Sequence, residues 1–182
     1  MRSLIVKTTV ICLLASAIAL FCIHDSQKTA KAVVTYWHKI PPNTCIIKSV
    51  GDDLSIADNG DAYGYLRIGQ NVTGPVAMEA YCPVNLPHGV VGKTLRIRDF
   101  QTGGLPAYTK VTAALKRLSW YNSGTTLATA IIDESSDTDD DAIFSSTINN
   151  ESYQYLVHVT LTKYYSATVS PEISMIEIKY EQ

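Results

Sequence analysis

An acidic stretch in the second half of the chain carries the residue types best suited to hold a metal ion. Asp137, Asp139 and Asp141 alternate along it, and calcium takes several carboxylate and carbonyl oxygens from a flexible loop. A helix-loop-helix calcium loop requires a glycine at position 142 and a bidentate glutamate at position 148, but the chain has Ala142 and Ile148 there. A calcium site of the helix-loop-helix type is therefore excluded. The stretch therefore predicts either a calcium site at a sandwich edge or a solvated hairpin loop, and no other cofactor is indicated.

Three aromatic side chains and one imidazole could instead bind an organic ligand. Trp37, Trp120 and Tyr121 stand near expected strand ends, where their rings could stack on the apolar faces of a sugar. Packing within the sheets is the alternative, because aromatic residues favour strands. His88 lies in a turn between a proline and a glycine, where it either contacts a ligand or stabilises the turn.

No pattern of a known catalytic centre is present. The sequence contains no nucleophile elbow, no zinc-protease helix and no phosphate-binding loop. We expect a non-catalytic protein with a binding, adhesive or envelope-associated role, whose partner is a carbohydrate or a surface protein. Two alternatives stay open: a secreted hydrolase that uses acidic-loop carboxylates and His88, and a structural subunit of a surface assembly.

The segments that would position these side chains follow a β pattern. Apolar residues alternate with polar ones, and turn residues interrupt the alternation every 8 to 15 positions or so. The phase of the alternation shifts by one after Leu115, as a β-bulge would cause. The prolines of residues 83–89 predict a rigid crossover between two strands. The expected strands are 54–56, 63–68, 76–81, 94–98, 111–115, 127–132, 142–148, 153–162 and 173–180.

The number of expected strands indicates two packed sheets, because a single open sheet of this size would expose an apolar face. We therefore predict an all-β fold, an antiparallel two-sheet sandwich of the jelly-roll or Greek-key type, in one domain over residues 33–182. That domain contains Cys45 and Cys82. In an oxidising compartment they are expected to form one disulfide, and two buried thiols are the alternative.

The first 32 residues have the pattern of an export signal. A basic start precedes an apolar run from Thr8 to Ile23, and the small residues Ala30 and Ala32 suit a signal peptidase. The run is shorter than the roughly 20 residues of a membrane-spanning helix, which favours cleavage over a retained anchor. We expect a secreted, periplasmic or cell-surface protein that contacts the membrane only if this segment is retained.

The charge balance argues against nucleic acid as a partner. The full chain has 15 basic and 17 acidic residues, a net charge of −2. Without the four basic residues and one acidic residue of the leader, these counts fall to 11 and 16, a net charge of −5. A surface with this balance repels phosphate backbones.

The segment PVNLPHGV at 83–90 carries a resemblance to a known family. Together with 95–100, 111–117, 153–161 and 175–180, it resembles a family of secreted bacterial proteins of uncharacterised activity, in which a PVxLPHGA-type turn precedes a strand. This sequence has Val90 where that pattern has alanine. The resemblance implies a β-sandwich and no particular activity.

Overall fold

The computed structural model describes residues 32–48, 54–57, 64–68, 75–99, 109–119, 122–133, 139–164 and 171–182. The chain divides into two compact units, Met1–Val33 and Val34–Gln182, and the strands belong to the second. The leader and the candidate residues Trp120, Tyr121 and Asp137 lie outside the described residues. Within the described stretches, no helix has the length and apolar character needed to cross a membrane.

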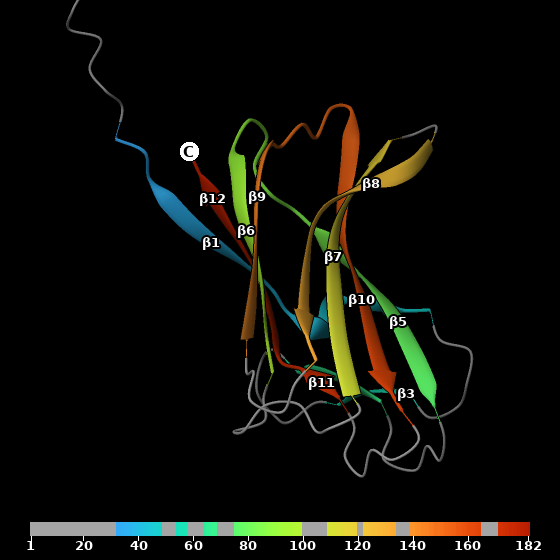
Figure 1. The fold of residues 1–182 in the computed structure, drawn as a ribbon. Helices are drawn as coiled ribbons and strands as arrows, with labels where there is room; N and C mark the ends of the chain where they lie inside the picture. Colours follow the sequence, from blue (N-terminus) through green and yellow to red (C-terminus); the bar gives the residue numbers. More distant parts are fainter. Residues whose placement is uncertain are drawn as a thin grey trace, which may run out of the picture. The chain divides into compact units, whose positions relative to one another are not determined.

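Strands make up most of the described part of Val34–Gln182 (Figure 1). A short 3-10 turn, η1 (Pro42–Thr44), follows the first strand. The strands are β1 (Thr35–Ile40), β2 (Ile46–Ile47), β3 (Leu54–Ala57), β4 (Tyr65–Ile68), β5 (Val76–Val84), β6 (Val91–Arg98), β7 (Thr109–Ser119), β8 (Asn122–Ile132), β9 (Asp139–Thr147), β10 (Tyr153–Lys163), β11 (Glu172–Ile173) and β12 (Met175–Glu181).

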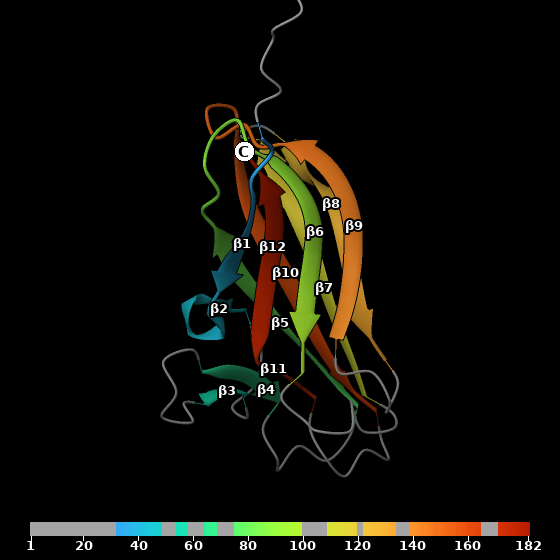
Figure 2. The same ribbon diagram turned by 90° about the vertical axis from the view of Figure 1, so that its left-hand side faces the viewer.

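The long strands form two antiparallel sheets that pack face to face (Figures 1 and 2). One sheet has the order β1-β12-β6-β9 and the other β2-β5-β10-β7-β8, while β11-β4-β3 form a small third sheet. The two-residue strand β2 is left out of the following comparison. When the other eight strands of the two large sheets are numbered 1 to 8 along the chain, the strand orders are 1-8-3-6 and 2-7-4-5. This is the order of a jelly roll, so the predicted all-β sandwich is confirmed.

The alternation of side chains places one face of each large sheet in a shared core. In β10, the residues Tyr155, Val157, Val159 and Leu161 are buried, while the residues between them are half-buried. Ile176 and Ile178 of β12 and Leu95 and Ile97 of β6 are buried from the opposite sheet. Each such aliphatic side chain stabilises the fold by about 1.5–3 kcal/mol relative to exposure.

The predicted disulfide joins Cys45 and Cys82. Both residues are buried, and the bond ties the chain beside η1 to the five-stranded sheet at β5. Because it closes a loop of 37 residues in sequence separation, the chain-entropy model assigns it about 4 kcal/mol.

Several predicted strand boundaries differ from the observed ones, and two of these differences bear on the candidate sites. β5 does not end at Tyr81 but continues through Pro83 to Val84 in register with β10. The proline is tolerated because β2 pairs with β5 only at Ala80 and Tyr81, so the other side of β5 is open at Pro83 within the described residues.

The second wrong boundary concerns the acidic stretch. Asp139–Asp141 were expected in a loop, but they form the start of β9. Their Cα partners are Arg98, Ile97 and Arg96 of β6. Cross-strand pairs of opposite charge stabilise a sheet, which explains why this sequence forms a strand.

Candidate functional site

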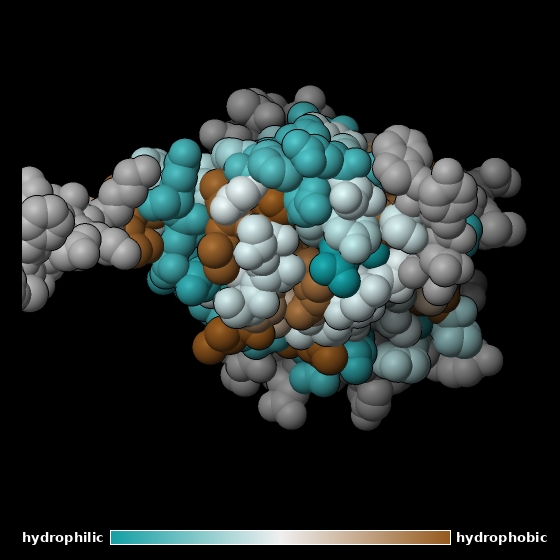
Figure 3. Space-filling view, turned by 90° about the horizontal axis from the view of Figure 1, so that it is seen from above, coloured by the Kyte–Doolittle hydropathy of each residue, from teal (hydrophilic) through white to brown (hydrophobic). Residues whose placement is uncertain are grey.

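A cavity opens where the crossover after β5 meets the start of β10. Its volume is about 590 Å³, and it is lined by residues 83–87, Asn150 and residues 153–155. This volume falls within the range of about 300–1,000 Å³ that is usual for small-ligand sites. The end of the domain seen from above carries apolar patches between polar side chains (Figure 3).

Residues 85–87, which we call the crossover wall of the cavity, alternate between exposed and buried side chains. Leu86 is 3% exposed and packs into the core, while Asn85 and Pro87 on either side of it are exposed. Gly89 then turns the chain with a φ of +82°, a backbone conformation that side-chain-bearing residues rarely adopt. Residues 85 and 87 are therefore held at the surface by the burial of the residue between them.

Hydrogen bonds fasten this wall to the β9–β10 turn. The side-chain amide of Asn150 donates to the carbonyl oxygen of Leu86 (2.8 Å), and the backbone N–H of Asn150 donates to Nδ1 of His88 (3.2 Å). The backbone N–H of Gly89 donates to the carbonyl oxygen of Ile148 (2.8 Å). His88 thus acts as an acceptor that stabilises the turn, and it lies beside the cavity without lining it.

Two tyrosines, Tyr155 and Tyr153, line the cavity, and Tyr153 is the less buried of them. It begins β10 and has Ser119, the last residue of β7, as its Cα partner. The guanidinium of Arg117 lies 4.6 Å from the Tyr153 ring centroid, a cation–π contact that restrains the ring. The neighbouring Tyr155 is buried, and its hydroxyl accepts a hydrogen bond from the backbone N–H of Asn149 (2.9 Å). The Tyr153 ring is therefore restrained by a cation over one of its faces.

The lining of the cavity is uncharged. Asn85, Asn150 and Gln154 supply carboxamides, and the remaining lining residues are proline, leucine, valine and tyrosine. A carboxamide both donates and accepts hydrogen bonds. The lining can therefore bind neutral hydroxyl groups, whereas it supplies no counter-charge to an anion. The described lining holds no histidine, carboxylate or lysine that could transfer a proton.

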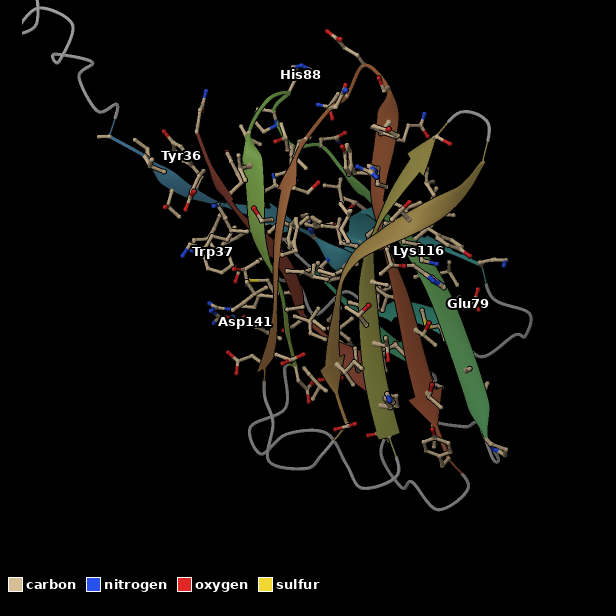
Figure 4. All side chains as sticks on the ribbon, turned by 45° about the horizontal axis from the view of Figure 1, so that its top comes forward. Tyr36, Trp37, Glu79, His88, Lys116 and Asp141 are labelled. Atoms are coloured by element: carbon tan, nitrogen blue, oxygen red, sulfur yellow. A yellow bond between two sulfur atoms is a disulfide. The ribbon has the colours of Figure 1, made fainter. Side chains whose placement is uncertain are left out.

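Trp37 lies elsewhere, on the outer face of the four-stranded sheet (Figure 4). It is 38% exposed. The guanidinium of Arg96 lies 4.5 Å from its ring centroid and donates to both carboxylate oxygens of Asp141 (2.5 and 2.6 Å). These hydrogen bonds hold the pKa of Asp141 below its usual value. Trp37 and Asp141 thus lie on the same face of the four-stranded sheet, and both contact the guanidinium of Arg96.

Of the predicted calcium ligands, Asp141 is engaged in contacts within the protein, as is the neighbouring Asp140. Both oxygens of Asp141 accept from Arg96, and a carboxylate oxygen of Asp140 accepts from the backbone N–H of Ile131 (2.7 Å). Asp137 lies outside the described residues. Among the residues that the structure does describe, no group of three or more histidine, cysteine, aspartate or glutamate side chains is placed to hold a metal ion. The calcium site stays a prediction.

The structure does not bring the other candidates together. Figure 4 shows His88 well apart from both Trp37 and Asp141. The hydrolase alternative needs His88 beside an acidic-loop carboxylate, and this pairing is not formed with Asp141. β7 ends at Ser119 and β8 begins at Asn122, on either side of Trp120 and Tyr121.

A polar cluster on the outer face of the five-stranded sheet was not anticipated. Tyr81 of β5 stacks on His158 of β10 with ring centroids 4.8 Å apart. A carboxylate oxygen of Glu79 lies 3.5 Å from Nε2 of His158 and 3.4 Å from Nζ of Lys48. Burial first, and then the charge of Lys116, lower the pKa of His158. Alternation places these residues on outward faces, but only the register between β5 and β10 joins them.

The residues of the cavity were likewise missed, although two signals for them are present. The carboxamide of Asn85 between Pro83 and Pro87 marks an exposed polar group on rigid backbone, and Asn150 stands in a turn. Neither signal reveals that the segments meet. Their contact follows from the pairing of β5 with β10 over residues 76–84 and 155–163.

No family model matches the chain, and no curated protein matches it either. Among solved structures, the CBM22-1–GH10 modules of Clostridium thermocellum endo-1,4-β-D-xylanase 10B, complexed with xylohexaose, align at 13% identity with a TM-score of 0.40. This alignment covers 78% of the chain and 25% of the xylanase chain, so the chain spans a quarter of that protein's length.

Two further solved structures are similar at the same level. TmCBM61 in complex with β-1,4-galactotriose aligns at 11% identity with a TM-score of 0.38, covering 84% of the chain and 88% of the module. The infectious bursal disease virus Gx strain aligns at 10% identity with a TM-score of 0.33, covering 83% of the chain and 31% of the viral one. Similarities this distant do not identify a ligand.

Proposed function

We propose that the chain is an exported, non-catalytic binding module that holds a neutral saccharide in the cavity between the crossover 85–87 and the start of β10. The observation that carries this proposal is the composition of the cavity lining. Three carboxamides and a braced tyrosine ring surround about 590 Å³ of space without a charged side chain.

The chemistry of the lining matches that of a sugar. Each sugar hydroxyl donates and accepts hydrogen bonds, as the side chains of Asn85 and Gln154 do. The apolar faces of sugar rings suit an aromatic side chain such as Tyr153, which has an apolar body and a polar tip. An apolar ligand would leave the carboxamides unpaired, and no lining residue supplies a counter-charge to an anion, so a neutral polar ligand suits the lining best.

Two further observations support export. The leader has the basic start, apolar run and small residues of a signal peptide. The disulfide between Cys45 and Cys82 belongs in an oxidising compartment. A secreted, periplasmic or cell-surface module is the assignment that accounts for both.

Glycan-array screening followed by calorimetry tests the proposal. The full chain should bind a neutral oligosaccharide, and Tyr153→Ala or Asn85→Ala should each weaken that binding tenfold or more. Tyr164→Ala is the matched control, because Tyr164 is an exposed tyrosine just after the opposite end of β10. Absence of binding to every neutral glycan, or binding that survives both cavity substitutions, would overturn the proposal.

A further inference from the structure

β1 forms the outer edge of the four-stranded sheet and, within the described residues, pairs only with β12. The pair Val34 and Gln182 shows which residues of β1 turn their backbone groups toward β12. The N–H of Val34 donates to the carbonyl oxygen of Gln182 (3.3 Å), and the N–H of Gln182 donates to that of Val34 (3.1 Å). In an antiparallel ladder such mutually bonded pairs recur at every second residue. Tyr36, His38 and Ile40 therefore direct their backbone groups to β12, and the residues between them direct theirs outward.

The outward backbone groups belong to Thr35, Trp37 and Lys39. Natural edge strands are often blunted by prolines, bulges or charged side chains such as lysine. β1 has continuous register with β12, no proline and a single lysine. It thus presents an intact row of hydrogen-bonding groups.

The same edge concentrates exposed apolar side chains. Of the eight exposed large hydrophobic residues in the described part of the chain, three lie within residues 34–37. Val34 is 46% exposed, Tyr36 42% and Trp37 38%. Exposed apolar side chains that gather at one place mark an interaction surface, unlike residues scattered singly.

We propose that β1 pairs antiparallel with β1 of a second copy of the chain, across a two-fold axis at Trp37. The pairing joins two four-stranded sheets into one continuous sheet. It is independent of the saccharide cavity, which lies at the crossover and the five-stranded sheet.

The sequence of β1 is complementary to itself in this register. Trp37 faces Trp37 of the partner subunit, and Thr35 faces Lys39 of the partner subunit, so every outward residue of β1 is paired. Aromatic pairs stabilise neighbouring strands, and no like charges stand directly opposite each other. Lys39 also lies 4.0 Å from the carboxylate of Glu177 on its own sheet, which balances its charge at the interface. A two-fold contact of this kind closes at a dimer.

Cysteine cross-linking tests the register. In the full chain with Cys12→Ser and Cys22→Ser, the variant Trp37→Cys should form an intermolecular disulfide, because mutually bonded antiparallel partners have Cα atoms about 5.5 Å apart. Lys39→Cys is the matched control on the same face. Its copies are offset by four residues, roughly 13 Å, and should not cross-link. Mixing Thr35→Cys with Lys39→Cys should give heterodimers.

Sedimentation with an edge-blocking variant tests the pairing itself. The wild-type chain should show a concentration-dependent dimer. Thr35→Pro removes an outward N–H without removing a β12 hydrogen bond, so it should weaken the dimer tenfold or more at an unchanged melting temperature. A wild-type chain that stays monomeric would overturn the proposal. So would a dimer that persists unchanged in Thr35→Pro, which would indicate association through another part of the chain.

Discussion

The guanidinium of Arg96 on β6 lies 4.5 Å from the ring centroid of Trp37 on β1, across the intervening strand β12. Asp141 on β9 accepts two hydrogen bonds from the same guanidinium. One cation therefore links an aromatic ring on one edge strand to a carboxylate on the last strand of the sheet. Such contacts are worth about 0.5–1 kcal/mol at exposed sites, and they orient the indole at the proposed two-fold axis.

Asp141→Asn should destabilise the domain only when the carboxylate of Asp141 would be ionised. Arg96 lowers the pKa of Asp141, so the stabilisation is present above the unfolded-state pKa of about 3.9 and is lost as the pH falls through the lower folded-state pKa. Because the Asp141 side chain is 41% exposed, we expect a loss of about 1 kcal/mol or less at pH 7. Urea unfolding at pH 7 and pH 3 measures the difference.

The matched control for this prediction is Asp139→Asn, which removes a carboxylate from the same face of β9, where Asp139 has Arg98 as its Cα partner. We expect a smaller loss than for Asp141→Asn. Equal losses for the two variants at pH 7 would contradict a specific role for the two hydrogen bonds to Asp141.

The pKa of His158 should lie below its usual value of about 6.5 and should respond to its charged neighbours with opposite signs. Burial and the charge of Lys116 lower this pKa, Lys48 lowers it further, and Glu79 raises it. Lys116→Met should therefore raise the pKa of His158, and Glu79→Gln should lower it. NMR titration of the imidazole resonances measures both shifts. Shifts of the same sign in the two variants would contradict the arrangement.

Stability should fall on the acid side because His158 is held neutral in the folded state. Above the unfolded-state pKa both states are neutral, and as the pH falls from there toward the lower folded-state pKa the unfolded state gains protons first. Burial also lowers the pKa of His38. His158→Gln should therefore reduce the loss of stability between pH 7.5 and pH 5, and adding His38→Gln should reduce it further. Thermal unfolding across this range is the measurement.

Replacing both Cys45 and Cys82 by alanine should cost about 2–5 kcal/mol of unfolding free energy. The disulfide restricts the unfolded chain, and both residues are buried in the folded domain. Urea unfolding of the double variant and of the reduced wild-type protein should give similar midpoints, both below that of the oxidised protein. An unchanged midpoint on reduction would contradict the prediction.

Asn150→Ala should loosen the cavity wall by removing the hydrogen bond to the carbonyl oxygen of Leu86. We expect a loss of about 1 kcal/mol in unfolding free energy and a several-fold weaker affinity for the bound saccharide. Glu151→Ala is the control, because it changes an exposed side chain of the same turn that is not part of the cavity lining. Calorimetry and urea unfolding on the two variants separate these effects.

The local pattern of the sequence predicted the β-sandwich because the alternation of apolar and polar residues has the period of a strand. The bulge predicted after Leu115 is wrong for β7, which keeps a continuous register with β10 from Thr109 to Ser119. The irregularity at that level lies in β8, where Ala128 pairs with Leu115 and Thr126 with Lys116. The expected strands 54–56 and 63–68 correspond to β3 and β4, which pair over Leu54–Ala57 and Tyr65–Ile68. The strand β1 was not anticipated, because Thr35–Ile40 lacks a clear alternation and its place is set by pairing with β12.

By itself the sequence predicted the fold class, the strands with strong alternation and the pairing of Cys45 with Cys82. The first two depend on short-range patterns, and each of these cysteines has one possible partner within residues 33–182. Only the tertiary structure decided which distant side chains meet. The crossover wall and Asn150 are more than 60 positions apart, and Arg96 reaches Asp141 over 45 positions. Such contacts depend on strand order and register, which arise from the packing of both sheets and leave no local period in the chain.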